Sequence, residues 1–166
     1  MQPEKVDEML KNFKSNLGRC AHLRVMIGEL ERRYEKAHNE GVEELLGSNG
    51  ENDGMPHGSS IGNPTERAGL LLASGYVSET MRYIRLEIWG LQAEYDDRIA
   101  TVDYVRAWLK GLTSKEVWMI GQQIFDGLCY REINHNYREK YGESCSKDLL
   151  RRLRKDALAK IYEMAA

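Results

Sequence analysis

The chain has 166 residues, of which 42% are hydrophobic and 30% are charged, with a formal net charge of −2 at pH 7. This composition suits a soluble protein with long solvated helices, and the small net charge argues against a general polyanion binder. The first residues are charged, and no apolar run reaches the roughly 18 residues of a membrane span, so we expect a cytoplasmic protein without a secretory signal.

The chain has three cysteines, namely Cys20, Cys129 and Cys145. Their number is odd and none of them forms a Cys-x-x-Cys pair. This spacing favours free thiols in a reducing compartment over a disulfide framework or a structural zinc site.

The first predicted element is a long helix from Pro3 to about Asn39. Its apolar residues repeat at alternating intervals of four and three, which is the spacing of a narrow coiled-coil seam. The step between the two registers, from Cys20 to Leu23, is three residues where four would keep phase. Packing within the chain and pairing with a second chain both remain open. The first register comprises Val6, Leu10, Phe13, Leu17 and Cys20, and the second comprises Leu23, Ile27, Leu30, Tyr34 and Ala37.

Residues 41–62 contain six glycines and no periodic apolar pattern, which predicts a flexible linker. A phosphate-binding loop is excluded because no Gly-Lys-Ser/Thr follows the glycines. An EF-hand beginning at Asn49 would place Ser60 at the twelfth position, where calcium binding needs glutamate. His57 has no second histidine or cysteine within the spacing of a metal motif.

A second long helix is predicted from Asn63 to about Lys110. Asn63 suits the N-cap, Pro64 the first helical position and Glu66 the third. Two long amphipathic helices joined by a linker predict an antiparallel hairpin over residues 1–110. Because neither helix is stable alone, we expect pairing within the chain, self-association or both. Three tryptophans occur at helical positions that suit a core or an interface, namely Trp89, Trp108 and Trp118.

Residues 111–166 predict a separate unit of three helices, which makes the whole fold all-α. Thr113 and Glu116 form a capping box at the start of the first of these helices, and Gly127 ends it. The second helix spans Tyr130–Tyr141 and ends at Gly142. The last helix starts at about Ser146. Its predicted buried stripe comprises Leu149, Leu150, Leu153, Ala157, Leu158 and Ile161.

Basic charge is concentrated on this last helix. Residues 145–161 carry six basic and two acidic side chains, a net charge of +4, whereas residues 1–112 carry 14 basic and 18 acidic side chains, a net charge of −4. A basic helix that follows two short helices is typical of a helix-turn-helix DNA-binding unit, although a solvated charged face gives the same pattern. The candidate DNA-binding residues are Ser146, Lys147, Asp148, Arg151, Arg152, Arg154 and Lys155.

The C-terminal pattern resembles region four of bacterial sigma factors. The matching positions are Leu112, Glu116, Phe125-Asp126-Gly127, Tyr130-Arg131-Glu132-Ile133, Ser146, Arg154, Ala157 and Leu158. Residues 64–69, with the sequence Pro-Thr-Glu-Arg-Ala-Gly, extend the resemblance to phage late-gene transcription activators of the RinA/ArpU type. The resemblance implies a sequence-specific DNA-binding regulator of phage or prophage type, with double-stranded DNA and RNA polymerase as partners.

Two positions depart from the sigma-like pattern. The pair Tyr141-Gly142 begins eight residues after Ile133, four more than usual, which adds about one turn, or 6 Å, to the second helix. Asn134 replaces a small alanine where two helices are expected to cross. The departure leaves open which residues of the last helix contact bases.

Two other functions remain open. An oligomeric DNA-packaging subunit of the small-terminase kind would also bind phage DNA, and a coiled-coil interaction protein could use the basic helix on an acidic partner. We expect no enzyme activity, cofactor or metal, because the four histidines are dispersed and the carboxylates lie among basic partners.

Overall fold

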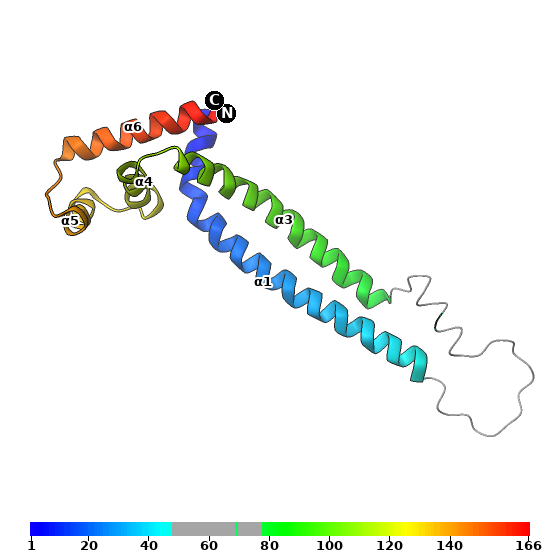
Figure 1. The fold of residues 1–166 in the computed structure, drawn as a ribbon. Helices are drawn as coiled ribbons and strands as arrows, with labels where there is room; N and C mark the ends of the chain where they lie inside the picture. The colour runs from blue at the N-terminus through cyan, green and yellow to red at the C-terminus, as the bar shows by residue number, and fades with distance from the viewer. Residues whose placement is uncertain (48–68, 70–77) are drawn as a thin grey trace, which may run out of the picture. The chain divides into compact units, whose positions relative to one another are not determined.

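The computed structural model describes residues 1–47, 69 and 78–166, and every regular element in these ranges is a helix (Figure 1). The fold is therefore all-α, as predicted. The element η1 is a π-helix. The elements are α1 (Pro3–Gly47), α3 (Glu79–Lys110), α4 (Ser114–Ile120), η1 (Gly121–Phe125), α5 (Tyr130–Tyr141) and α6 (Lys147–Ala165).

The long helices α1 and α3 form an antiparallel pair, and shorter helices follow them, which confirms the predicted hairpin (Figure 1). The chain forms two compact units. One contains residues 1–22 and 95–166, and the other contains residues 23–94. This division falls where the seam of α1 changes register between Cys20 and Leu23, and it differs from the division at residue 110 that the sequence suggests. The first part of α1 and the last part of α3 thus belong to the same unit as the C-terminal helices.

In the unit of residues 23–94, the first three members of the second predicted register are buried, whereas Tyr34 and Ala37 are half-buried. Leu23, Ile27 and Leu30 of α1 and Met81 and Ile84 of α3 are all less than 9% exposed. A side-chain hydrogen bond also joins the two helices, because Arg85 Nη2 donates to the Tyr34 hydroxyl at 2.7 Å. The alternating four-and-three spacing therefore correctly identified the face that pairs within the chain.

In the other unit, one apolar cluster joins α1, α3, α4 and α6. Leu17, predicted to belong to the seam, is 37% exposed, whereas Met9, which the spacing omitted, is 8% exposed. A four-helix cluster needs a wider apolar face than the narrow seam between two helices, which explains why Met9 is recruited. The buried members of this cluster are Val6, Met9, Leu10, Val105, Trp108, Ile120, Ala157 and Ile161.

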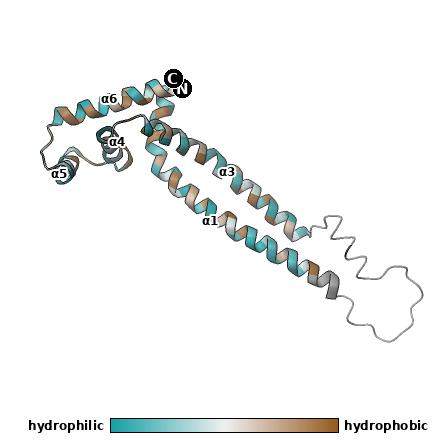
Figure 2. Cartoon of the chain, viewed as in Figure 1, coloured by the Kyte–Doolittle hydropathy of each residue, from teal (hydrophilic) through white to brown (hydrophobic). Residues whose placement is uncertain are grey.

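A second cluster packs α4 against α5 and α6 around the buried Tyr137. Figure 2 shows the corresponding alternation of hydrophobic and hydrophilic residues along these helices. Gly142 ends α5 in the left-handed region with φ of 74°, where residues with a side chain are disfavoured, as the predicted break at this position requires. The two clusters hold α6 from both ends of its buried stripe.

Two predicted boundaries change in the structure. Helix α1 continues through Gly41 to Gly47, so the first residues of the predicted linker are helical. Helix α3 begins at Glu79, where Ser78 Oγ accepts a hydrogen bond from Met81 N at 3.2 Å. The predicted start at residues 63–66, the rest of the linker and His57 lie outside the described residues. The predicted helix from Thr113 to Gly127 is an α-helix only as far as Ile120.

Among the helices that the structure describes, none is both long and apolar enough to span a membrane.

Candidate nucleic-acid interface

The last helix begins where the sequence predicts. Ser146 is the N-cap of α6, and its hydroxyl accepts a hydrogen bond from Leu149 N at 3.2 Å. Leu150, Ala157 and Ile161 are buried on one side of α6. Leu149 was predicted to join this stripe but is 37% exposed, because it lies about 100° around the helix from Leu150.

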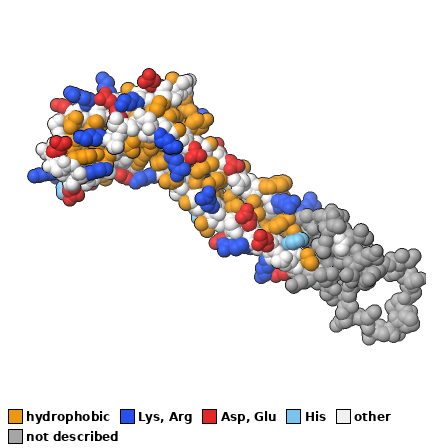
Figure 3. Space-filling view, viewed as in Figure 1, with side chains coloured by type: hydrophobic (Ala, Val, Ile, Leu, Met, Phe, Trp, Pro, Cys, Tyr) orange, Lys and Arg blue, Asp and Glu red, His pale blue; other side chains and the backbone are white. Residues whose placement is uncertain are grey.

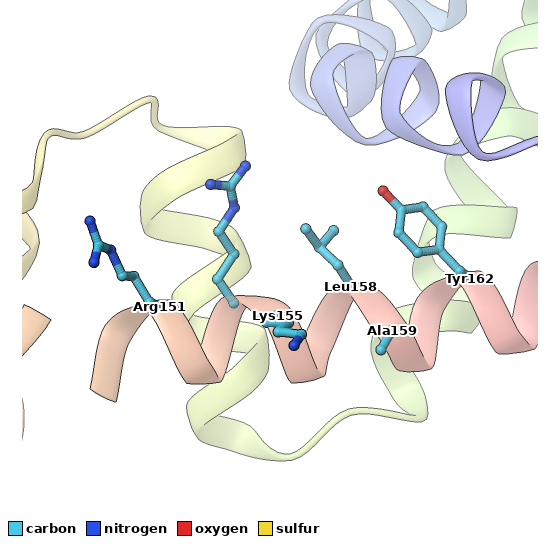
Figure 4. A pocket seen from close by; sticks show the side chains of 6 residues that line it. Arg151, Lys155, Leu158, Ala159 and Tyr162 are labelled. Carbon is cyan, nitrogen blue, oxygen red and sulfur yellow. The ribbon is translucent and has the colours of Figure 1, made fainter. Parts of the chain in front are cut away.

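All seven candidate DNA-binding residues are exposed. Arg151 and Lys155 are four residues apart and therefore lie on one side of α6, where Asp148 precedes them by one turn. We call Asp148, Arg151 and Lys155 the outer face of α6. Figure 4 shows Arg151 and Lys155 on this helix beside a groove, and Figure 3 shows basic side chains on the surface of the C-terminal helices. The groove is lined by Arg151, Arg154, Lys155, Leu158, Ala159 and Tyr162.

Arg152 and Arg154 do not lie together. Residues two positions apart in the sequence of an α-helix are rotated about 200° from each other around its axis. The side chains of Arg152 and Arg154 therefore leave opposite sides of α6. Arg154 and Arg151 line a second hollow of about 160 Å³ next to Tyr130 and Gln123, which Arg152 does not reach. The predicted set is thus an outer face flanked by one arginine on each side.

Arg151 on the outer face forms only a weak, exposed ion pair within the chain. Arg151 Nη1 lies 3.8 Å from Asp148 Oδ1, with both side chains at least 70% exposed. Exposed ion pairs of this kind contribute about 0–1 kcal/mol, so Arg151 can exchange Asp148 for a nucleic-acid group at small cost. Lys147 Nζ lies 5.8 Å from the centre of the Tyr130 ring, a cation–π contact that directs it away from the outer face toward α5.

Lys160 has a structural partner. Its Nζ lies 2.7 Å from Oε1 of Glu116, whose side chain is 6% exposed. Glu116 Oε2 also accepts hydrogen bonds from Thr113 N at 2.8 Å and Thr113 Oγ1 at 2.9 Å, which confirms the capping box. One basic charge of α6 therefore anchors the helix to α4, and sequence reasoning missed this pair because 44 residues separate its members.

The Glu116 carboxylate is stabilised by its neighbours. Burial by itself raises the pKa of Glu116, but the Lys160 ammonium and the Thr113 donors outweigh it, and the pKa lies below its usual value. A carboxyl with a lowered folded pKa contributes stability above its unfolded pKa of about 4.3, and this contribution is lost as the pH falls through the folded pKa.

We therefore expect the chain to lose stability below about pH 4.3 more steeply than a Glu116→Gln variant does. Glutamine keeps an acceptor for the Thr113 donors but does not titrate. Thermal unfolding measured at several pH values between about 3 and 7 tests this prediction. Parallel curves for the two proteins would contradict it.

The turn before α6 is held by two hydrogen bonds. Asn134 Oδ1 accepts from Cys145 N at 3.0 Å, and the Tyr130 hydroxyl donates to Cys145 O at 3.2 Å. Asn134, which departs from the alanine of the sigma-like pattern, thus acts as an anchor for the start of α6. The helix α5 runs without a break to Tyr141, so the four additional residues extend it.

The Phe-Asp-Gly segment begins at Phe125, the last residue of the π-helix η1. Asp126 N donates to Gly121 O at 2.9 Å across five residues, and Asp126 forms an ion pair with Lys14 of α1. Phe125 packs on Phe13 with the ring centres 4.7 Å apart. Gly127 has φ of 65°, which the turn into α5 requires. These residues connect the C-terminal helices to α1 rather than to the outer face of α6.

None of the three cysteines is in a disulfide, and Cys20 and Cys145 are buried whereas Cys129 is exposed. Burial raises the pKa of the Cys145 thiol. Within the ranges that the structure describes, no three His, Cys, Asp or Glu side chains are grouped so that they could hold a metal ion.

Comparisons with known proteins add no assignment. No protein-family model matches the chain, and no curated protein and no solved structure matches it.

Proposed function

We propose that the chain binds double-stranded DNA through α6 and regulates transcription as a phage-type activator in the cytoplasm of a bacterial host. One observation carries the proposal. The helix α6 is fixed on one side by two apolar clusters and presents Arg151 and Lys155 on its exposed side. A rigid helix with an exposed basic side is what insertion into the major groove requires. The resemblance of residues 112–158 to sigma region four supports the same use.

The arrangement around α6 suggests different roles for its basic residues. With the outer face directed at the base edges, Arg151 can donate a bidentate pair to guanine, and Asp148 can orient it or accept from cytosine. Arg152 and Arg154, on opposite sides of the helix, then face the two sugar-phosphate backbones that border the major groove of the DNA. We assign both to phosphate contacts, which set position without selecting sequence.

A salt titration tests DNA binding directly. The logarithm of the affinity for duplexes selected from a random pool should fall linearly with the logarithm of the salt concentration, with a slope of about −0.9 for each phosphate neutralised. Four phosphate contacts would give a slope of about −3.6. Fluorescence anisotropy with labelled duplexes provides the measurement. If no duplex is enriched and no salt-dependent binding is detected, the proposal is wrong.

DNA binding alone does not separate a regulator from a packaging subunit. A reporter gene placed downstream of an enriched duplex should be activated by the chain if it is a transcription activator that contacts RNA polymerase. An unchanged reporter, together with a ring of many subunits in light scattering, would favour packaging instead.

A further inference from the structure

The unit of residues 23–94 leaves large hydrophobic side chains of α3 in solvent. Tyr83, Leu86 and Trp89 are 67%, 59% and 62% exposed. The seam with α1 uses Met81 and Ile84, which are buried, and Leu86 lies about 200° around the helix from Ile84. These exposed residues are therefore on the side of α3 that faces away from α1. Figure 3 shows hydrophobic side chains at the surface of the hairpin.

The exposed residues repeat with the spacing of a helix-pairing surface. Leu86, Trp89, Gly90 and Ala93 follow one another at intervals of three, one and three residues, which places them in one stripe along the helix. We call these four residues the second seam. A helix with apolar seams on two opposite sides is typical of an element packed between two others, and a contiguous exposed apolar patch marks an interaction surface.

We propose that the second seam pairs with the second seam of another copy of this chain, with the two α3 helices antiparallel. The two halves of the second seam differ in side-chain size. Leu86 and Trp89 in the first half are bulky, and Gly90 and Ala93 in the second half are small. An antiparallel arrangement about a two-fold axis between Trp89 and Gly90 brings Leu86 opposite Ala93 and Trp89 opposite Gly90. Bulky residues of each copy then meet small residues of the other, as an isologous interface requires. A Cβ atom added at Gly90 would meet nothing within 4 Å, so the space for the partner's side chain is open.

The charges of this stretch follow the same division. Residues 79–86 carry Glu79, Arg82 and Arg85, a net charge of +1, and residues 87–94 carry Glu87 and Glu94, a net charge of −2. An antiparallel pair places the positive half of each helix beside the negative half of the other, whereas a parallel pair places like charges together. Size and charge therefore favour a second copy in the antiparallel orientation.

Sedimentation equilibrium tests the occupant of the second seam. The unchanged chain is expected to sediment as a dimer at micromolar concentration, and Trp89→Glu as a monomer, because the substitution places two carboxylates near the axis. Val25→Glu is the matched control, since Val25 is 59% exposed on α1 of the same unit but lies outside the second seam. It should leave the dimer intact. A monomeric unchanged chain, an assembly larger than two copies, or a Trp89→Glu variant that remains dimeric would overturn the proposal.

Disulfide trapping tests the orientation, in a Cys129→Ser background that removes the exposed thiol. Gly90→Cys should crosslink to itself on oxidation, because the two Gly90 residues flank the proposed axis. Ala93→Cys should not crosslink, because the two Ala93 residues are offset by about seven residues, or 10 Å, along the helices. Crosslinking of both variants would indicate a parallel pair, and crosslinking of neither would place the interface elsewhere. Either result contradicts the proposal.

Discussion

The Arg151→Ala, Lys155→Ala double variant should bind its selected duplex at least about 30-fold more weakly than the unchanged chain. The effect combines about 1–3 kcal/mol for a bidentate arginine–guanine pair with the removal of a second charge from the outer face of α6. The slope of log affinity against log salt should become shallower by about 1 for each phosphate that the variant no longer neutralises. Fluorescence anisotropy across a salt series gives both quantities.

Arg106→Ala is the matched control for this experiment. Arg106 pairs with Asp103 three residues away on α3, as Arg151 pairs with Asp148 on α6, and both pairs are exposed. Removal of Arg106 should leave DNA affinity unchanged. Arg152→Ala should weaken binding to all duplexes by a similar factor, because a phosphate contact carries no sequence preference. An equal fall in affinity for Arg106→Ala would show that general charge, and not the outer face of α6, binds DNA.

Tyr137→Ala should destabilise the C-terminal helices by about 3–5 kcal/mol, as truncation of large buried aromatic side chains usually does. Tyr137 is 1% exposed, and its ring lies 5.5 Å from that of Trp118 and 4.5 Å from that of Tyr141. Its removal leaves a cavity in the cluster that positions the turn before α6. A fall of about 10 °C in the thermal midpoint, followed by circular dichroism, is the expected result.

Tyr137→Phe separates packing from hydrogen bonding. This variant keeps the ring and removes only the hydroxyl, which accepts a hydrogen bond from Lys115 Nζ at 3.3 Å and donates to Glu143 Oε1 at 3.5 Å. Because Lys115 and Glu143 are both exposed, we expect a cost below about 1 kcal/mol. If Tyr137→Phe were as unstable as Tyr137→Ala, the hydroxyl rather than the packed ring would hold the cluster.

Most of the secondary structure could be predicted from local signals. The capping box at Thr113, the glycine at position 142 and the N-cap at Ser146 act over three or four residues, and the structure confirms all three. The ends of the long helices were less predictable. Gly41 carries a helix-breaking tendency of only about 1 kcal/mol, which the surrounding helix formers outweigh, so α1 continues to Gly47.

The candidate interface was predicted in composition but not in arrangement. Sequence counting identified six basic residues on the last helix without indicating which of them have partners. Lys160 is held by Glu116 across 44 residues, and Lys147 lies over Tyr130. In the sequence, Asn134 stood out only because the sigma-like pattern has alanine at this position. In the structure it accepts a hydrogen bond at the turn before α6. Such contacts join residues that are distant in the chain, and no local spacing indicates them.

The sequence by itself determined an all-α chain with a long hairpin, a C-terminal group of short helices and basic charge on the last of them. It could do so because apolar periodicity and helix caps act within one or two turns. Only the tertiary structure decided that Leu149 and Trp89 are exposed, that Arg152 and Arg154 lie on opposite sides of α6, and that Lys160 pairs with the buried Glu116. The side of a helix that is buried depends on which neighbours pack against it, and those neighbours come from parts of the chain that local patterns do not connect.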